Sequence, residues 1–237
     1  MRFMNCRTVP AGLVAVLISG LTLAGSVTGT VKYEGAVPKL PPIRMDADPG
    51  CAKKHDSPVK SEALVLGDGN TIGNIFVRVK SGVPAKDYPA PKEPVVVDQQ
   101  GCRYIPHVLG VMAGQPLKIL NSDGLLHNIH ALPKVNKSFN MAMPATRTEA
   151  EATFTKEEFM FKVKCDVHPW MGAWVAVMTH PFFDVTAADG KFDIGNLPPG
   201  TYEIEAWHEK LKTKTASVTI SGDESQTIDF SFSRPAR

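Results

Sequence analysis

Short runs of alternating apolar and polar residues recur along the chain, and turn-forming residues separate them. Asn74–Lys80, Gln115–Leu120 and Thr201–Trp207 are clear examples. A period of two is typical of strands that bury one face. With 19 glycines and 19 prolines, the composition favours many turns and short strands over long helices. The sequence therefore predicts an all-β chain built from β-sandwiches, with helix-like patterns only near Thr146–Ala152 and Glu209–Lys212.

The N-terminus predicts export. Arg2 and Arg7 precede an uncharged run, residues 8–30, with an apolar centre followed by small residues. This pattern predicts a signal peptide over residues 1–26, cleaved near Ser26, and a periplasmic or secreted protein. An uncleaved membrane anchor is the alternative. The strongly apolar part is shorter than the ~20 residues that a spanning helix needs, so we expect no membrane span after cleavage.

The charges of the chain are balanced. It carries 26 Lys and Arg against 24 Asp and Glu, and removal of the predicted signal peptide removes Arg2 and Arg7. No basic excess is then left to neutralise a phosphate backbone, so we expect no nucleic-acid partner.

The cysteines suggest one disulfide and one thiol with another role. Of the four cysteines, Cys6 lies in the predicted signal peptide, which leaves Cys51, Cys102 and Cys165. In an oxidising compartment an odd number implies a pair and a remainder. Cys51 and Cys102 both follow glycine in turn-like contexts, so a disulfide between them is predicted. Two buried free thiols are the alternative.

The remaining cysteine begins the most informative motif. Cys165, His168 and Met171 follow one another at intervals of three residues, directly after the predicted strand Phe159–Lys164. Thiolate and thioether ligands combined with imidazole select copper, and a Cys, two His and a weak axial Met form an electron-transfer site. A second histidine is therefore needed. His127 and His130 are candidates, but on a strand they face opposite sides, so only one can reach the site.

Other copper chemistries lack their motifs. Position 169 is proline, so the loop holds no second cysteine for a binuclear centre. The chain also contains no His-x-His pair of the kind that multicopper oxidases need for a trinuclear cluster. We therefore expect an electron carrier and not an enzyme.

The pattern Asn121-x-Asp123-x-x-x-His127-Asn128, with the cysteine motif beginning 38 residues after His127, resembles the cupredoxins. It is most similar to the amicyanin-type, plastocyanin-like members. The resemblance covers residues 93–180 and implies a Greek-key β-sandwich with one type 1 (blue) copper ion. The ligands that it implies are His127, Cys165, His168 and an axial Met171. Asn128 would join the two ligand segments by a hydrogen bond.

A second resemblance covers the C-terminal part. Val185–Tyr202, with its Pro-Pro-Gly turn, resembles the carboxypeptidase regulatory-like (transthyretin-like) β-sandwich. Because residues 181–237 are too short for a full sandwich, residues 27–92 are expected to supply the missing half. The cupredoxin would then be inserted in this smaller sandwich, with contacts between residues 28–36 or 73–80 and residues 190–230. The combination is similar to bacterial exported proteins described as methylamine-utilisation or plastocyanin-like.

These resemblances imply one-electron, outer-sphere transfer between redox partners such as a c-type cytochrome or a dehydrogenase. Partner docking is expected at Pro169 and Trp170, beside the exit edge of the loop histidine. A copper carrier or store, and a structural or carbohydrate-contacting envelope protein, are the alternatives. His107 and His130 are expected to lie outside the ligand set, and Met141 and Met143 are expected to form an apolar lining. No role is predicted for Trp207-His208-Glu209.

Overall fold

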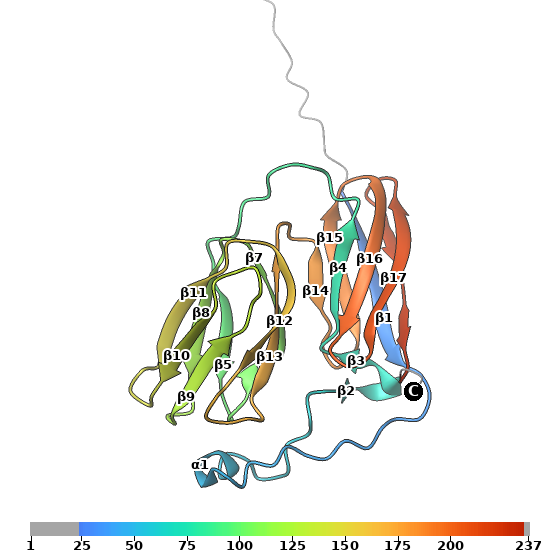
Figure 1. Cartoon of the computed structure of the whole chain (residues 1–237). Helices are drawn as coiled ribbons and strands as arrows, with labels where there is room; N and C mark the ends of the chain where they lie inside the picture. The colour runs from blue at the N-terminus through green and yellow to red at the C-terminus, as the bar shows by residue number, and fades with distance from the viewer. Residues whose placement is uncertain (1–23, 235–237) are drawn as a thin grey trace, which may run out of the picture.

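The computed structural model describes residues 24–234, which form two β-sandwiches side by side (Figure 1). The prediction of an all-β fold with a larger and a smaller β-sandwich is confirmed. Most of the predicted signal peptide, residues 1–23, lies outside the described residues. The predicted cleavage position near Ser26 lies within the first strand, β1 (Gly25–Tyr33). Within residues 24–234 no helix has the length and apolar character needed to cross a membrane.

The larger sandwich holds the predicted ligands. Its first sheet has the order β10 (Phe139–Met143), β9 (His127–Ala131), β12 (Glu158–Lys164), β13 (Gly172–Met178) and β7 (Val108–Met112). Its second sheet has the order β11 (Glu149–Thr153), β8 (Pro116–Asn121), β5 (Val95–Gln99) and β6 (Tyr104–Ile105). β7 runs parallel to β13, and β5 runs parallel to β8. Their inward side chains, such as Ile119 and Val175, share one buried core.

The second sandwich combines strands from both ends of the chain. One sheet contains β15 (Lys191–Leu197), β1, β18 (Ser225–Thr227) and β19 (Phe230–Phe232). The other has the order β14 (Phe183–Val185), β4 (Phe76–Ser81), β16 (Gly200–His208) and β17 (Lys212–Ile220). Val27 of β1 lies opposite Ile194, and Val77 of β4 lies opposite Ala206. The expected contacts between the N-terminal segment and residues 190–230 are therefore present.

The chain between β1 and β4 leaves this sandwich and returns to it. It passes beneath the larger sandwich, where it forms the short helix α1 (Pro49–Ala52), before the small strands β2 (Val65–Leu66) and β3 (Ile72–Gly73) and the 3-10 turn η1 (Asp68–Asn70) (Figure 1). The helix begins with an Asp48 N-cap and a proline, a favourable start. The predicted disulfide between Cys51 and Cys102 is present, and it attaches α1 to the larger sandwich.

Aromatic residues join the two sandwiches. Trp207 of β16 packs edge-on against Trp174 of β13, with ring centroids 5.4 Å apart. It also packs against Phe159 of β12 at 6.4 Å. These rings belong to a separate apolar cluster between the sandwiches, which gives the Trp207-His208-Glu209 motif a place at the interface.

Both helix-like expectations are wrong. Thr146–Ala152 leads into strand β11, whose residues pair with β8 and bury Ala150 in the core. Glu209–Lys212 spans the turn between β16 and the start of β17, where Nδ1 of His208 accepts hydrogen bonds from the backbone of Lys210 and Leu211. In the first segment, pairing with β8 outweighs the local helix propensity, whereas the second segment forms the turn of the β16–β17 hairpin.

Candidate metal centre

The strand arrangement brings the predicted ligands to one end of the larger sandwich. His127 begins β9 and Cys165 directly follows β12, its antiparallel neighbour. The start of one antiparallel strand lies beside the end of the next, so these two side chains meet. His168 and Met171 occupy the tight turn from β12 to β13. This turn is closed by hydrogen bonds from the Cys165 amide to the Met171 carbonyl (3.2 Å) and from the Met171 amide to the His168 carbonyl (3.0 Å).

Three donor atoms converge in the interior. The Nδ1 atoms of His127 and His168 lie 2.9 Å apart, and Sγ of Cys165 lies 3.9 Å from Nδ1 of His168. One ligand atom from each residue lies within 4.8 Å of the other two. His127 is 0%, His168 2% and Cys165 2% exposed, so water is largely excluded. The cluster is of the size and chemical type that one metal ion can occupy.

Carboxylates fix the orientation of both imidazoles. Nε2 of His127 lies 2.8 Å from Oδ2 of Asp123, and Nε2 of His168 lies 2.9 Å from Oδ2 of Asp48. A carboxylate only accepts, so each ring donates an N–H from Nε2, and the two Nδ1 atoms face each other. Nδ1 atoms 2.9 Å apart need a proton or a cation between them. The residues present therefore fit a bound metal ion.

The ionisation of the cluster also suits metal binding. Burial raises the pKa of the Cys165 thiol, but the hydrogen bond with His127 and nearby backbone N–H groups outweigh burial and lower it to about 7. Burial lowers the pKa of His127, but its contacts with Asp123 and Cys165 outweigh burial and raise it to about 9. The thiolate form that metals bind is therefore accessible near neutral pH, and the proton that a metal must displace is held on the imidazole side.

Asp123 connects several parts of the centre. Its carboxylate accepts hydrogen bonds from the backbone amides of Gly101 and Cys102, both at 2.7 Å, and forms an ion pair with Lys54 at 3.2 Å. Burial raises the pKa of Asp123, whereas these contacts and His127 lower it to about 2 overall. Asp123 belongs to the sequence pattern before His127, but its role as a partner of the ligand was not predicted. Asp48 has no comparable sequence signal, because it lies 120 residues before its partner.

Asn128 lies between the two ligand segments. Its Oδ1 accepts a hydrogen bond from the backbone amide of Asp166 at 2.6 Å and lies 3.2 Å from Sγ of Cys165. Tyr104 donates its hydroxyl to the carbonyl of Asn128 at 2.5 Å. The chain at the start of β9 is thereby held against the chain that follows β12.

Two methionines lie in the apolar surroundings. Met171 is 2% exposed and belongs to the same buried core as Cys165. Met143 is also fully buried and lies directly opposite His127 in the pairing of β10 with β9. Met141 is only partly buried and packs at the edge of this core.

The two other candidate histidines lie outside the cluster. His130 faces the opposite side of β9 from His127, and its Nδ1 lies 2.9 Å from Oδ2 of Asp166. His107 contacts the carbonyl of Gly172 with Nδ1 (2.9 Å) and Glu209 with Nε2 (2.8 Å). His107 therefore lies between the residue after Met171 and the second sandwich.

The proposed docking residues differ in their surroundings. Pro169 is exposed, whereas Trp170 is half-buried. The indole N–H of Trp170 donates to the carbonyl of Cys102 at 3.1 Å, and its ring lies 5.0 Å from the His168 ring. The His168 edge that is expected to face a partner is itself covered by Asp48.

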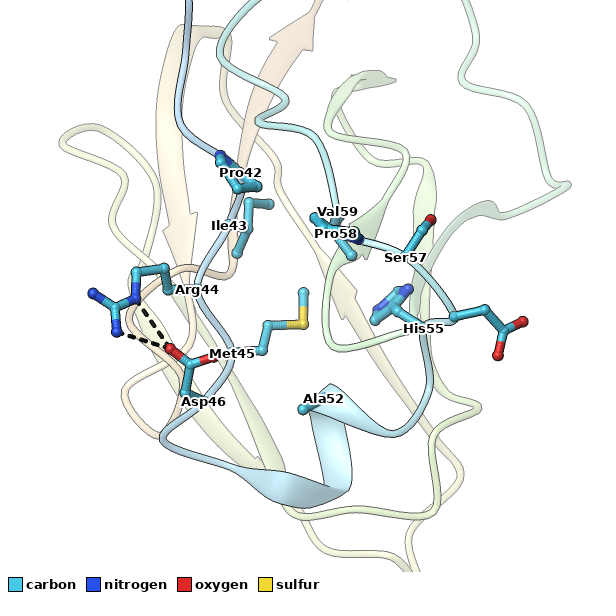
Figure 2. A pocket seen from close by; sticks show the side chains of 11 residues that line it. Pro42, Ile43, Arg44, Met45, Asp46, Ala52, His55, Ser57, Pro58 and Val59 are labelled. Carbon is cyan, nitrogen blue, oxygen red and sulfur yellow. Dashed lines mark hydrogen bonds and ion pairs between the residues drawn. The ribbon is translucent and has the colours of Figure 1, made fainter.

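A pocket of about 540 Å³ lies within the N-terminal segment, between residues 42–46 and residues 52–59 (Figure 2). Met45 and His55 line it, together with an exposed Arg44–Asp46 ion pair at 3.0 Å. None of the four predicted ligands lines this pocket. It is therefore separate from the candidate metal centre.

Known proteins resemble different parts of the chain. Residues 169–233 match the family model of the carboxypeptidase regulatory-like domain, which confirms that part of the predicted resemblance. The match begins in the ligand loop and does not include β1 or β4, the strands that precede the larger sandwich. The search of curated proteins found no match.

Solved structures match the chain over less than half of its length. An oxidised amicyanin mutant is 23% identical, with 43% of this chain and 98% of that chain covered and a TM-score of 0.33. A purple cupredoxin from Nitrosopumilus maritimus is 24% identical, with 35% and 99% covered and a TM-score of 0.30. A Cu-containing nitrite reductase from Thermus scotoductus SA-01 is 20% identical, with 41% of this chain and 25% of the reductase covered and a TM-score of 0.34. The chain thus spans a quarter of the reductase.

Proposed function

We propose that this chain is an exported mononuclear copper protein that transfers single electrons between redox partners in the periplasm or outside the cell, and that it is not an enzyme. The observation that carries the proposal is the buried convergence of one thiol and two imidazole Nδ1 atoms, all within 4.8 Å. Cys165, His127, His168 and Met171 would hold the ion. Bound copper would supply a one-electron couple between Cu(I) and Cu(II).

The protein would hold its ligands in nearly the same positions in both oxidation states. His127 and Cys165 are attached to paired strands, and the His168 turn is closed by backbone hydrogen bonds. Asp123 and Asp48 fix the imidazole tautomers. Burial of the donors keeps water from the ion. These features support a centre that rearranges little when an electron enters or leaves.

The burial of the proposed ligands also favours electron transfer over transport of copper by a carrier protein. A carrier exchanges its metal, and so needs ligands that a partner protein can reach. His127, Cys165 and His168 are each no more than 2% exposed. This burial supports slow metal exchange, whereas electrons can cross a thin protein layer. We propose Pro169 and Trp170 as the docking surface for a redox partner, because Trp170 lies against the His168 ring.

A paired substitution on one strand tests the proposed copper site. His127→Ala removes a proposed ligand, while His130→Ala removes an imidazole that faces the other side of β9. After addition of Cu(II), visible absorption and electron paramagnetic resonance should show a copper–thiolate centre in the wild type and in His130→Ala. The signal should be lost or strongly altered in His127→Ala. An unchanged spectrum in His127→Ala would contradict the ligand assignment.

A further inference from the structure

The segment Met45–Lys54, which we term the N-terminal cap, covers the end of the larger sandwich where the ligands meet. It contains α1 and lies far from the ligand loop in sequence, yet Asp48 contacts His168 directly at 2.9 Å. His168 is consequently only 2% exposed. A ligand imidazole is thus closed off by a carboxylate from another part of the chain.

Both oxygens of the Asp48 carboxylate have hydrogen-bonding partners. Its Oδ1 accepts hydrogen bonds from the backbone amides of Gly50 (2.7 Å) and Cys51 (3.3 Å), at the start of α1. Its Oδ2 faces Nε2 of His168. One side chain therefore caps the helix with one oxygen and orients the imidazole with the other.

Covalent and ionic contacts keep the cap in place. Cys51 is disulfide-bonded to Cys102, whose amide is held by Asp123 at 2.7 Å. Lys54 at the end of the cap pairs with the same Asp123, which also orients His127. The cap therefore reaches both histidines, one directly through Asp48 and the other through the Lys54–Asp123 pair.

We propose that Asp48 is a positioning residue of the metal centre, which orients His168 and stabilises Cu(II) relative to Cu(I). The proposal rests on the proposed copper function. A carboxylate that accepts the distal N–H of a ligand histidine fixes its tautomer and makes the imidazole a stronger donor. Its negative charge also favours the more highly charged ion. Asp48 thereby lowers the reduction potential of the centre.

Asp48→Asn tests this role with little change to the helix, because Asn is as good an N-cap as Asp. The matched control is Asp46→Asn, since Asp46 is exposed and, among residues 24–234, forms an ion pair only with Arg44 on the surface. We expect Asp48→Asn to weaken Cu(II) binding about tenfold more than Cu(I) binding. For a one-electron couple, this corresponds to a rise of about 59 mV in the reduction potential. Asp48→Glu, which keeps the charge, should restore part of the difference.

Equal potentials in the wild type, Asp46→Asn and Asp48→Asn would overturn the proposal. A second measurement separates its failure from failure of the copper function. Imidazole ¹⁵N NMR of the metal-free protein should show His168 protonated at Nε2 in the wild type, and Asp48→Ala should reduce this preference. If the wild type binds no copper, the proposed function fails, and the NMR result decides whether Asp48 orients His168. A His168 ring without a proton at Nε2 in the metal-free wild type overturns the inference.

Discussion

Nε2 of His107 lies 2.8 Å from Oε1 of Glu209, and this contact joins the two sandwiches at the end of the ligand loop. The same imidazole contacts the carbonyl of Gly172, the residue after Met171, at 2.9 Å. Two residues before Glu209 in the sequence, Trp207 packs against Trp174 across the interface between the sandwiches. The Trp207-His208-Glu209 motif, which had no predicted role, therefore connects the second sandwich to the larger sandwich.

The contact between His107 and Glu209 should make the stability of the protein depend on pH. Burial lowers the pKa of His107, but the hydrogen bond with Glu209 and the charge of Glu62 outweigh burial, so the net pKa is raised. The resulting stabilisation is complete below the unfolded-state pKa of about 6.5 and is lost as pH rises through the higher folded-state pKa. Glu209→Gln should reduce the free energy of unfolding by about 1.5–3 kcal/mol at pH 6, and less at higher pH.

Urea unfolding between pH 6 and pH 9 measures this effect. Glu203→Gln is the control, because Glu203 forms an exposed pair with Lys80 on the second sandwich. It should change stability by less than about 1 kcal/mol. Parallel pH profiles for the wild type and Glu209→Gln would contradict the assignment.

The second prediction concerns acid stability. Burial lowers the pKa of His208 to about 4. The unfolded chain therefore binds a proton at higher pH than the folded protein does, and stability falls as pH drops from about 6.5 towards 4. His208 should account for about 3 kcal/mol of this loss. In His208→Asn, whose amide oxygen can still accept the turn hydrogen bonds, unfolding followed by fluorescence should show a shallower decline; an unchanged slope would exclude His208 as the cause.

The disulfide gives a third prediction. It joins residues separated by 51 positions, and such a closure removes about 4 kcal/mol of unfolded-state entropy. The double variant Cys51→Ser and Cys102→Ser should lose about this much stability in guanidinium unfolding. It should also release copper to a chelator faster, because the N-terminal cap loses its covalent attachment. Release at the wild-type rate would show that the cap does not retain the metal.

A matched pair of glycines tests the strand arrangement of the second sandwich. A Cβ at Gly29 of β1 would overlap the backbone carbonyl of Ile228, whereas no heavy atom lies within 4 Å of a Cβ built at Gly195 of β15. Gly29→Ala should therefore lower stability by about 1–3 kcal/mol. Gly195→Ala should have little effect. Thermal unfolding compares the two variants, and equal midpoints would argue against the packing of β1 beside residues 225–230.

Local patterns in the sequence were sufficient to predict much of the fold. Alternation predicted strands at Asn74–Lys80 and Thr201–Trp207, because a half-buried strand leaves a period of two in its own residues. The Thr146–Ala152 segment misled, since its strand β11 exists through pairing with β8 and not through its own propensity. Glu149–Thr153 does alternate polar and apolar residues, but Glu and Ala are strong helix formers, and this composition favoured the helix interpretation.

In the candidate metal centre, too, local patterns were predictable from the sequence and long-range contacts were not. Cys165, His168 and Met171 lie in one short loop, so their spacing alone suggested copper. Asp48 could not be predicted as a partner of His168, because it reaches the centre by a long excursion of the chain and one disulfide. Asp48 covers the edge of His168 from which electrons were expected to pass to a partner. The sequence of the loop gave no sign of this cover.

Binding of copper by the Cys165 thiolate can be measured spectroscopically. Cu(II) is added to the purified wild type and to Cys165→Ser, and visible absorption is recorded together with electron paramagnetic resonance. We expect an intense thiolate-to-copper band in the wild type that is absent in Cys165→Ser. A wild-type protein that stays colourless and gives no cupric signal under oxidising conditions would contradict it.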